Sequence, residues 1–218
     1  MRGVWGNLCG FKSRPRHYRV NGEIVKSPNG GGKSKKMKIG VIADTHGNVD
    51  AWRKVMKKFF HDADMIIHAG DIFNYGPRNI VHEGTEPGDL AEEMNGLEIP
   101  IIAARGNCDS DIDATVVSFP IQSPFALVQA DSLRILVNHG DLLDDEKKIE
   151  LAKKWHVNVF VSGHTHRPKL AREGDIVLLN PGSPSLPKEE PTVGLILKEG
   201  DQFEVRIIDI ETGQVIID

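Results

Sequence analysis

Seven side chains able to bind metal ions stand near the ends of short apolar segments in this chain. They are Asp44, His46, Asp71, Asn107, His139, His164 and His166. Asp44 and His46 are separated by one residue, as are His164 and His166. Residues i and i+2 of an extended segment point to the same side, so both members of each pair can reach one ion.

The donors of this set are carboxylate and amide oxygens and imidazole nitrogens, without a cluster of thiolates. Such a mixture suits Mn²⁺, Fe²⁺, Zn²⁺, Co²⁺ or Ni²⁺ and disfavours Ca²⁺ or an iron–sulfur cluster. Seven donors are too many for one tetrahedral ion and suit two ions. A single Asp at a strand end more often caps a helix or forms a turn, so the prediction depends on the whole set.

Short apolar segments must position these donors. Six of them end in small polar clusters, and they read KIGVIA, MIIHA, IIAAR, RILV, VFVS and IVLL. Runs of this kind predict strands, and the helical spacing of apolar residues over Asn48–Phe60 and Asp145–Trp155 predicts helices between them. Alternation of strand and helix is typical of α/β architecture, in which polar groups at the carboxyl ends of strands bind ligands.

Other apolar segments are too closely spaced for crossover helices. Phe125–Ala130 and Leu133–Asn138 flank a tight turn, and Thr192–Lys198, Phe203–Ile210 and Gln214–Ile217 repeat strand, turn, strand. We expect these segments to pair antiparallel. The predicted fold class is therefore α/β, with two mixed β-sheets packed face to face and helices outside them.

The charge distribution divides the chain at residue 36. Residues 1–36 contain nine Lys or Arg and one acidic residue, whereas residues 37–218 contain 18 Lys or Arg and 30 acidic residues. We expect residues 1–36 to be a basic, disordered N-terminal extension or a misplaced start, since the glycine-rich segment that ends it has nothing to bury. A basic tether to an anionic partner is the alternative. Residues 37–218 are the predicted domain.

The composition argues against several classes of protein. An acidic body disfavours a stable complex with nucleic acid, because phosphates are held by clustered Lys and Arg. Apolar runs of about six residues, such as Ile99–Ala104, are far shorter than the roughly twenty needed to span a bilayer. Two cysteines provide no disulfide framework, and the basic N-terminus has no apolar signal region, so we expect a cytoplasmic protein without membrane contact.

The ordered series DTHGN, GD, GNCD, NHGD, GHTH and NPGS resembles the motif series of the calcineurin-like metallophosphoesterases. The resemblance covers residues 37–218, and three of its segments look most like the small bacterial and archaeal YfcE-like branch of phosphodiesterases. It implies a four-layer α/β/β/α sandwich over a dinuclear metal centre. The implied function is hydrolysis of a small phosphodiester by attack of a metal-bridging hydroxide.

The resemblance also implies a role for each donor. One ion would be held by Asp44, His46 and His166, the other by Asn107, His139 and His164, and both by Asp71. Two cations about 3.5–4 Å apart acidify a shared water and neutralise charge on the phosphoryl oxygens. Mn²⁺ is the metal expected first, with Zn²⁺, Fe²⁺, Ni²⁺ and Co²⁺ left open.

Two further residues are candidates for catalysis beside Asp71 and Asn107. Cys108 stands where many relatives have a histidine that assists the leaving oxygen, so the resemblance implies a preference for diesters with good leaving groups. A thiol that only fills space is the alternative. Arg78 lies in a segment, residues 74–96, that we expect to be a loop bordering the pocket. It could clamp a phosphate oxygen, with a solvated arginine as the alternative.

Two other positions are expected to support the ligands without binding metal. His68 is predicted to be a core histidine or to orient a ligand. The segment Asn180–Ser183 is predicted to shape a tight turn near the metals.

A catalytically silent metal-binding scaffold or interaction protein of the same fold is the main alternative, as in the retromer subunit related to this branch. Scaffolds of this kind lose metal-binding histidines, whereas all seven ligand positions are filled here, which favours an enzyme. The short chain and acidic body disfavour a protein phosphatase or a nuclease. A small phosphodiester is the expected partner, and a homo-oligomer is left open.

Overall fold

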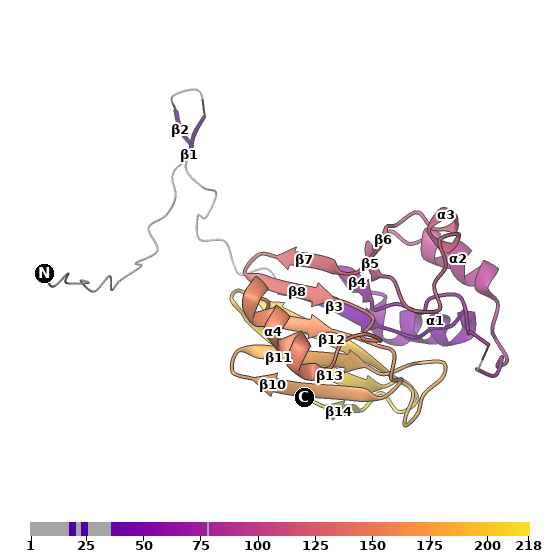
Figure 1. Ribbon diagram of the computed structural model, residues 1–218. Coiled ribbons are helices and arrows are strands. Elements are labelled where there is room, and N and C mark those ends of the chain that lie inside the picture. Colours follow the sequence, from indigo (N-terminus) through magenta and orange to yellow (C-terminus); the bar gives the residue numbers. More distant parts are fainter. Residues whose placement is uncertain (1–17, 21–22, 26–35, 78) are drawn as a thin grey trace, which may run out of the picture. The chain divides into compact units, whose positions relative to one another are not determined.

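The computed structural model describes residues 18–20, 23–25, 36–77 and 79–218 (Figure 1). The chain divides into two units, of which Lys36–Asp218 carries the two large sheets. Of the other unit, the described residues form a pair of antiparallel strands, β1 (Tyr18–Val20) and β2 (Glu23–Val25). Apart from these strands and Lys36, which is the first residue of a strand of the other unit, the disorder predicted for residues 1–36 concerns residues outside the described ones.

The first large sheet has seven strands in the order β14-β13-β12-β3-β4-β5-β6. They are β3 (Lys36–Ile42), β4 (Met65–His68), β5 (Ile101–Ala104), β6 (Ile121–Gln122), β12 (Thr192–Glu199), β13 (Gln202–Asp209) and β14 (Val215–Ile217). Neighbours from β3 to β6 are parallel, whereas β12 is antiparallel to β3 and β13, and β13 to β14. The antiparallel pairing predicted for the C-terminal strands is confirmed.

The second large sheet has five strands in the order β10-β11-β9-β8-β7. They are β7 (Ala126–Ala130), β8 (Leu133–Val137), β9 (Val159–Val161), β10 (Pro168–Glu173) and β11 (Ile176–Pro181). The three inner strands are parallel, and the two edge strands are antiparallel to their neighbours. Both sheets are therefore mixed, as predicted, and β7 and β8 form the predicted hairpin.

Within the described residues, five helical segments join the strands. They are α1 (Val49–Val55), the π-helical η1 (Met56–Phe60), α2 (Pro87–Asn95), α3 (Asp113–Val116) and α4 (Asp145–Trp155). Asn48 begins α1 by accepting the backbone N–H of Ala51 at 2.8 Å. Asp144 begins α4 in the same way, with the N–H of Lys147 at 2.8 Å. Each cap satisfies a backbone donor that the first turn of a helix leaves unpaired.

Alternate residues of the strands face different cores, because successive side chains of a strand point to opposite faces. In β3, Ile39 and Val41 pack between the two sheets, whereas Ile42 packs with residues of α1 and α2. In β9, Phe160 packs with Ala152 of α4 on the outer face of the second sheet. The layers are helices, sheet, sheet and helix, which is the predicted four-layer sandwich (Figure 1).

Two predicted elements differ from the structure. The single helix predicted over Asn48–Phe60 is divided into α1 and η1. Residues 74–96, predicted to form a loop, contain α2, which starts with Pro87 in its first turn and buries Leu90, Ala91 and Met94. Among the helices that the structure describes, none is long and apolar enough to cross a membrane.

Candidate metal centre

The seven donors predicted from the sequence all follow the carboxyl ends of strands. Asp44 and His46 follow β3, and Asp71 and Asn107 follow β4 and β5 of the same sheet. The other three, His139, His164 and His166, follow β8 and β9 of the second sheet. Because these strands are parallel within their sheets, the loops meet at one edge of the sandwich (Figure 1).

Asp44, His46 and His166 form one buried group whose ligand atoms lie within 4.8 Å of one another. The two imidazoles face each other, with 3.2 Å between His46 Nε2 and His166 Nε2. Asp44 Oδ1 lies 3.4 Å from His166 Nε2 and 4.0 Å from His46 Nε2. Two nitrogens and a carboxylate oxygen thus converge on one point.

Asp71 lies between this group and His139. Its Oδ2 is 3.8 Å from His46 Nε2 and 3.4 Å from His139 Nε2. Its Oδ1 faces the other way and accepts the backbone N–H of Cys108 at 2.8 Å. Asp44, Asp71 and His139 form a second buried group of metal-binding type.

Asn107 and His164 complete the set at the exposed side of the site. Asn107 Oδ1 lies 3.0 Å from His139 Nε2, and His164 Nδ1 lies 3.3 Å from the same atom. The backbone N–H of His164 contacts both carboxylate oxygens of Asp44, at 3.2 and 3.0 Å. All seven predicted ligands are therefore brought together.

Backbone carbonyls orient three of the imidazoles. Nδ1 donates to a carbonyl oxygen in each case, from His46 to Asn74 at 2.7 Å, from His139 to Ala69 at 2.8 Å and from His166 to Leu186 at 2.7 Å. A carbonyl only accepts, so the proton resides on Nδ1 and Nε2 is left to face the centre. This is the arrangement that imidazole ligands of metals ordinarily have.

Left-handed backbone conformations concentrate at the same residues. Asp44, His46, Asp71, His164 and His166 all have positive φ angles, between 47° and 70°. Such angles are uncommon for residues other than glycine and cost free energy that the surrounding structure must offset. The loops are held in these conformations at the positions where the donor side chains converge.

The charges of Asp71 and His139 depend on each other. Burial opposes ionisation of Asp71, but hydrogen bonding and attraction by His139, with the N–H of Cys108, hold the pKa of the carboxyl at about 2. Burial likewise disfavours protonated His139, yet the carboxylates of Asp71 and Asp44 raise its pKa to about 9. In the metal-free protein a proton on His139 therefore occupies part of the position that a cation would take.

Asp109 is a supporting residue that the sequence analysis did not single out. It is buried, and its carboxylate accepts three backbone N–H groups, from Asp71 at 2.9 Å, Ile72 at 2.7 Å and Gly106 at 2.7 Å. These bonds connect the loop after β4 to the loop after β5. The position of Asp109 in GNCD, two residues after Asn107, was the available signal.

His68 lies beneath the site with both ring nitrogens engaged. Nδ1 accepts the N–H of Gly70 at 3.2 Å, and Nε2 lies 2.9 Å from Thr45 Oγ1, which donates to the carbonyl of Ile72 at 2.8 Å. Burial, with the nearby charge of His139, lowers the pKa of His68 to about 3. His68 is thus a neutral residue that supports the loops carrying Asp44 and Asp71.

In the segment Asn180–Ser183, predicted to shape a tight turn, Asn180 and Pro181 are the last residues of β11, and an Asx turn from Asn180 to Gly182 contacts the ligand loops. Asn180 Oδ1 accepts the N–H of Gly182 at 3.0 Å, and its amide donates to the carbonyl of Gly163 at 2.8 Å. Ser183 Oγ donates to the carbonyl of Asp44 at 2.7 Å. The turn therefore fixes backbone on both sides of the centre.

Of the two further catalytic candidates, Cys108 and Arg78, the structure describes only Cys108. Cys108 lies at the site, where Asn107 Nδ2 contacts its sulfur at 3.3 Å. Burial, together with the carboxylate of Asp71, raises the pKa of the Cys108 thiol to about 12, so the thiol is neutral in the metal-free protein. The neighbouring charges of the protein itself are acidic, from Asp71, Asp109 and Asp44. Arg78 lies outside the described residues.

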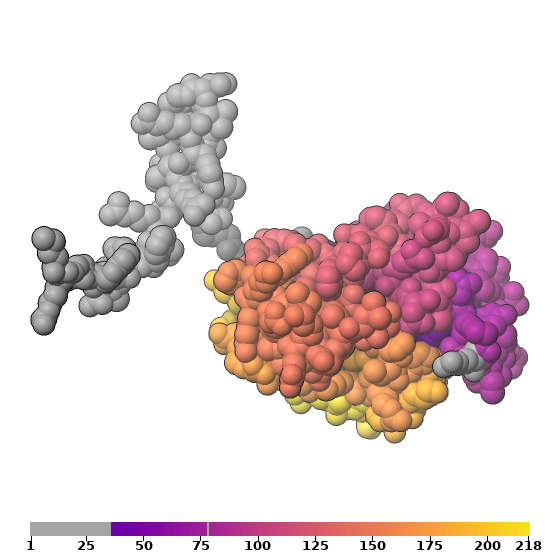
Figure 2. All heavy atoms as spheres, viewed as in Figure 1, coloured from indigo at the N-terminus to yellow at the C-terminus, as the bar shows by residue number. Residues whose placement is uncertain are grey.

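A cavity of about 380 Å³ opens beside the centre. Its lining includes residues of the centre and the loops beside it, which are Asp71, Asn107, Cys108, His164 and His166, and also Tyr75, Gly76, Pro77, Asn79 and Lys188. On the face shown in Figure 2, magenta and pink segments from the first half of the domain lie beside orange segments from its second half. The site likewise draws its donors from both halves.

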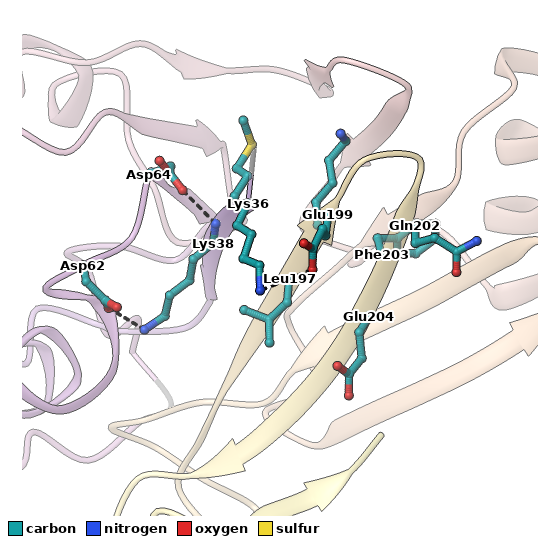
Figure 3. Close-up of a pocket in the computed structure, with 11 residues that line it drawn as sticks. Lys36, Lys38, Asp62, Asp64, Leu197, Glu199, Gln202, Phe203 and Glu204 are labelled. Carbon is teal, nitrogen blue, oxygen red and sulfur yellow. Dashed lines mark hydrogen bonds and ion pairs between the residues drawn. The ribbon is translucent and has the colours of Figure 1, made fainter. Parts of the chain in front are cut away.

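A larger cavity, of about 620 Å³, lies at the opposite end of β3, around Lys36 and Lys38 (Figure 3). Its lysines are paired with acidic groups: Lys38 Nζ lies 2.5 Å from Asp62, and Lys36 Nζ lies 3.4 Å from Glu199. None of the seven candidate ligands lines it. The larger cavity is therefore not the one beside the candidate metal centre.

Comparisons with known proteins agree with the geometry. A family model described as the calcineurin-like phosphoesterase superfamily domain matches residues 37–202. The Escherichia coli (strain K12) protein named phosphodiesterase YfcE is 38% identical over 153 residues, which are 70% of this chain and 82% of that protein.

Solved structures share the fold. That of Yfce, described as a phosphoesterase from E. coli, matches with a TM-score of 0.69 at 31% identity, covering 83% of this chain and 97% of that one. Vacuolar Protein Sorting 29 from Cryptosporidium parvum matches with a TM-score of 0.62 at 17% identity, covering 84% and 96%, and shows the fold alone. With its family model matching most of its length, this chain belongs to the calcineurin-like phosphoesterase superfamily.

Proposed function

We propose that the chain is a metal-dependent phosphoric diester hydrolase that acts on a small phosphodiester. One observation carries the proposal: two buried carboxylates, Asp44 and Asp71, lie among imidazole nitrogens that backbone hydrogen bonds aim at a common centre. The E. coli relative named a phosphodiesterase supports a diester as the substrate.

The proposed centre holds two divalent metal ions. We assign Asp44, His46 and His166 to one ion, Asn107, His139 and His164 to the other, and Asp71 to both. The position of Asp71 Oδ2 between His46 Nε2 and His139 Nε2 supports the shared role. When bound, two such cations acidify water to near-neutral pKa and neutralise charge on the phosphoryl oxygens.

The residues present fit a cation at this place. His46 and His166 both donate from Nδ1, so the two Nε2 atoms, 3.2 Å apart, face each other and can bind a cation when both imidazoles are neutral. Two lone pairs and the carboxylate of Asp44 are brought together in a buried site, where a positive charge offsets their mutual repulsion. Mixed oxygen and nitrogen donors suit Mn²⁺, Zn²⁺, Fe²⁺, Ni²⁺ and Co²⁺, and we propose Mn²⁺ first among them.

The chain's own residues fix the orientation of these ligands. Asp109 holds the backbone of Asp71 and Gly106, and the N–H of Cys108 holds Asp71 Oδ1. Oδ2 of Asp71 is thereby kept toward the histidines. Precise placement of this kind matters because a displacement of about 1 Å can cost a hundredfold in rate.

Cys108 supports a preference for diesters with good leaving groups. In the metal-free protein the raised pKa makes the Cys108 thiol a poor proton donor at neutral pH, which supports little help for an alkoxide leaving group. Aryl esters need less help because a leaving phenolate oxygen is less basic than an alkoxide. We propose for Arg78 a contact with a phosphate oxygen, supported by its place in the loop that contains Tyr75 and Asn79.

A metal-binding scaffold without turnover is the second candidate, and the fold of Vacuolar Protein Sorting 29 shows that this architecture is not confined to proteins named as phosphoesterases. The complete set of seven donors favours the enzyme. We propose a cytoplasmic location, supported by a composition with two cysteines.

The test compares two substrates on metal-stripped protein supplied with Mn²⁺: bis-p-nitrophenyl phosphate, a diester, and p-nitrophenyl phosphate, a monoester. We expect Mn²⁺-dependent turnover that favours the diester and falls at least a hundredfold in Asp71→Asn and in His139→Ala. Turnover by either variant at the wild-type rate would contradict the assigned site.

A further inference from the structure

One wall of the cavity beside the centre has no part in the proposed metal chemistry. It is formed by Tyr75, Gly76, Pro77, Asn79 and Lys188. A volume of about 380 Å³ lies in the range of sites for small organic molecules and exceeds the needs of a single phosphate group. The organic part of a substrate therefore has room on this side, next to the half-exposed ring of Tyr75.

The backbone of Lys188 is fixed to the metal centre. Its N–H donates to the carbonyl of His166 at 3.1 Å, and His166 Nδ1 donates to the carbonyl of Leu186 at 2.7 Å. Residues 186–188 are thus hydrogen-bonded to His166 through both its backbone and its ring. The exposed side chain of Lys188 starts from a fixed point on the cavity wall.

The charge of Lys188 is not neutralised within the part of the chain that the structure describes. No described carboxylate lies within 4.0 Å of its ammonium group, whereas the nearby Arg167 pairs with Glu189 at 2.6 Å. Of the described Lys and Arg residues, Lys188 alone lines this cavity. An unpaired ammonium at a cavity wall is a suitable donor for a phosphate group.

We infer that Lys188 binds a second phosphate group, on the organic part of the substrate, and so determines specificity. This inference rests on the proposed function and narrows its substrate class to nucleotide-type diesters that carry an additional phosphate. The aromatic base of such a substrate would lie beside Tyr75. The assigned metal ligands serve the scissile phosphate, which leaves the ammonium of Lys188 for the second one.

Calorimetry on the full chain loaded with Mn²⁺ tests this inference through binding. The probes are thymidine 3′,5′-bisphosphate and thymidine 5′-monophosphate, which differ in one phosphate. We expect the bisphosphate to bind about tenfold more tightly, the gain of one charge-assisted contact. Lys188→Gln should remove most of this difference and Lys188→Arg should retain it. Lys154→Gln removes an exposed lysine outside the cavity and should also retain it.

Two results would overturn the inference. One is equal affinity of the wild-type protein for both probes. The other is an equal loss of affinity for both probes in Lys188→Gln, which would place Lys188 on the phosphate that both share. A third result would separate the inference from the proposed function. If the bisphosphate binds more tightly because of Lys188 but the protein hydrolyses no diester, the inference is supported and the proposed function is contradicted.

Discussion

The carboxylate of Asp109 accepts the backbone N–H of Asp71 at 2.9 Å, and through this bond a residue outside the ligand set fixes the residue at the middle of the site. The same carboxylate also binds the N–H groups of Ile72 and Gly106. Asp109 therefore couples two loops that carry ligands, after β4 and after β5.

Replacement of Asp109 by Asn tests this coupling. Both carboxylate oxygens of Asp109 accept backbone N–H groups, and asparagine would replace one of these oxygens by an NH₂ group that cannot accept. We therefore expect Asp109→Asn to lower the free energy of unfolding by about 1–3 kcal/mol. Diester turnover should fall at least tenfold as Asp71 loses its position. Urea unfolding and steady-state kinetics measure the two effects. Asp111→Asn, at a side chain that is 94% exposed, is the matched control and should change neither.

Gly106 is a residue at which added volume should disturb the metal centre directly. A Cβ there would lie 2.2 Å from both the backbone N and Oδ1 of Asp71. We expect Gly106→Ala to destabilise the protein by about 1–3 kcal/mol and to lower the content of bound metal, measured by elemental analysis. A Cβ at Gly88 meets nothing within 4 Å, so Gly88→Ala should leave metal content unchanged. Full metal content in Gly106→Ala would contradict the role given to this close contact.

Metal binding should release protons at pH 7. His139 in the metal-free protein has a pKa of about 9, above its ordinary value of 6.5, and an imidazole must be neutral to bind a metal. We expect calorimetry in buffers of different ionisation enthalpy to show net proton release when Mn²⁺ binds. Apparent affinity should rise with pH up to about 9. His139→Gln should remove most of the released protons.

The same pKa shift gives the sign of a stability change in the metal-free protein. A group whose pKa is raised on folding stabilises the fold fully below its unfolded value, and this contribution is lost as pH rises through the folded value. We therefore expect the contribution of His139 to decline between about pH 6.5 and pH 9. Urea unfolding across this range checks the decline, which should be smaller in His139→Gln. A rise in the contribution of His139 would contradict the ion pairs with Asp71 and Asp44.

Cys108 should influence the choice between diesters and monoesters. Replacement by histidine introduces a group that can donate a proton near neutral pH, and general acids contribute about 10²–10⁴ in rate when well placed. We expect Cys108→His to raise the rate on an alkyl phosphomonoester, such as methyl phosphate, relative to bis-p-nitrophenyl phosphate by about tenfold, because only the alkoxide leaving group needs a proton. Cys108→Ser keeps a small, poorly acidic group and should retain the original ratio. An unchanged ratio in Cys108→His would indicate a side chain that only fills space.

The ligand set could be predicted from the sequence because its chemistry is local. Each donor directly follows a strand, and parallel strands bring their carboxyl ends to one edge. The hairpin formed by β7 and β8 was equally accessible, since a short turn leaves only antiparallel pairing. These features depend on spacing along the chain and need no knowledge of distant contacts.

Other features depend on contacts between distant segments. Asp109 can support Asp71 only because β4 and β5 lie side by side. Lys188 lies at the cavity only because its backbone N–H is hydrogen-bonded to His166. The helix α2 was missed, although Pro87 in its first turn and the spacing of Leu90 and Met94 are signals of a helix. The glycines and prolines of residues 74–96 favour a loop and oppose these signals.

The central claim, a two-metal phosphodiesterase, is tested most directly by adding Mn²⁺ back to metal-stripped protein. Bound Mn²⁺ and turnover of bis-p-nitrophenyl phosphate are measured at each step on the same samples. The account predicts binding that saturates at about two ions per chain, with turnover rising as the second ion binds. Two bound ions without turnover, with Mn²⁺ and with each of the other suited metals, would contradict the enzyme and favour the metal-binding scaffold.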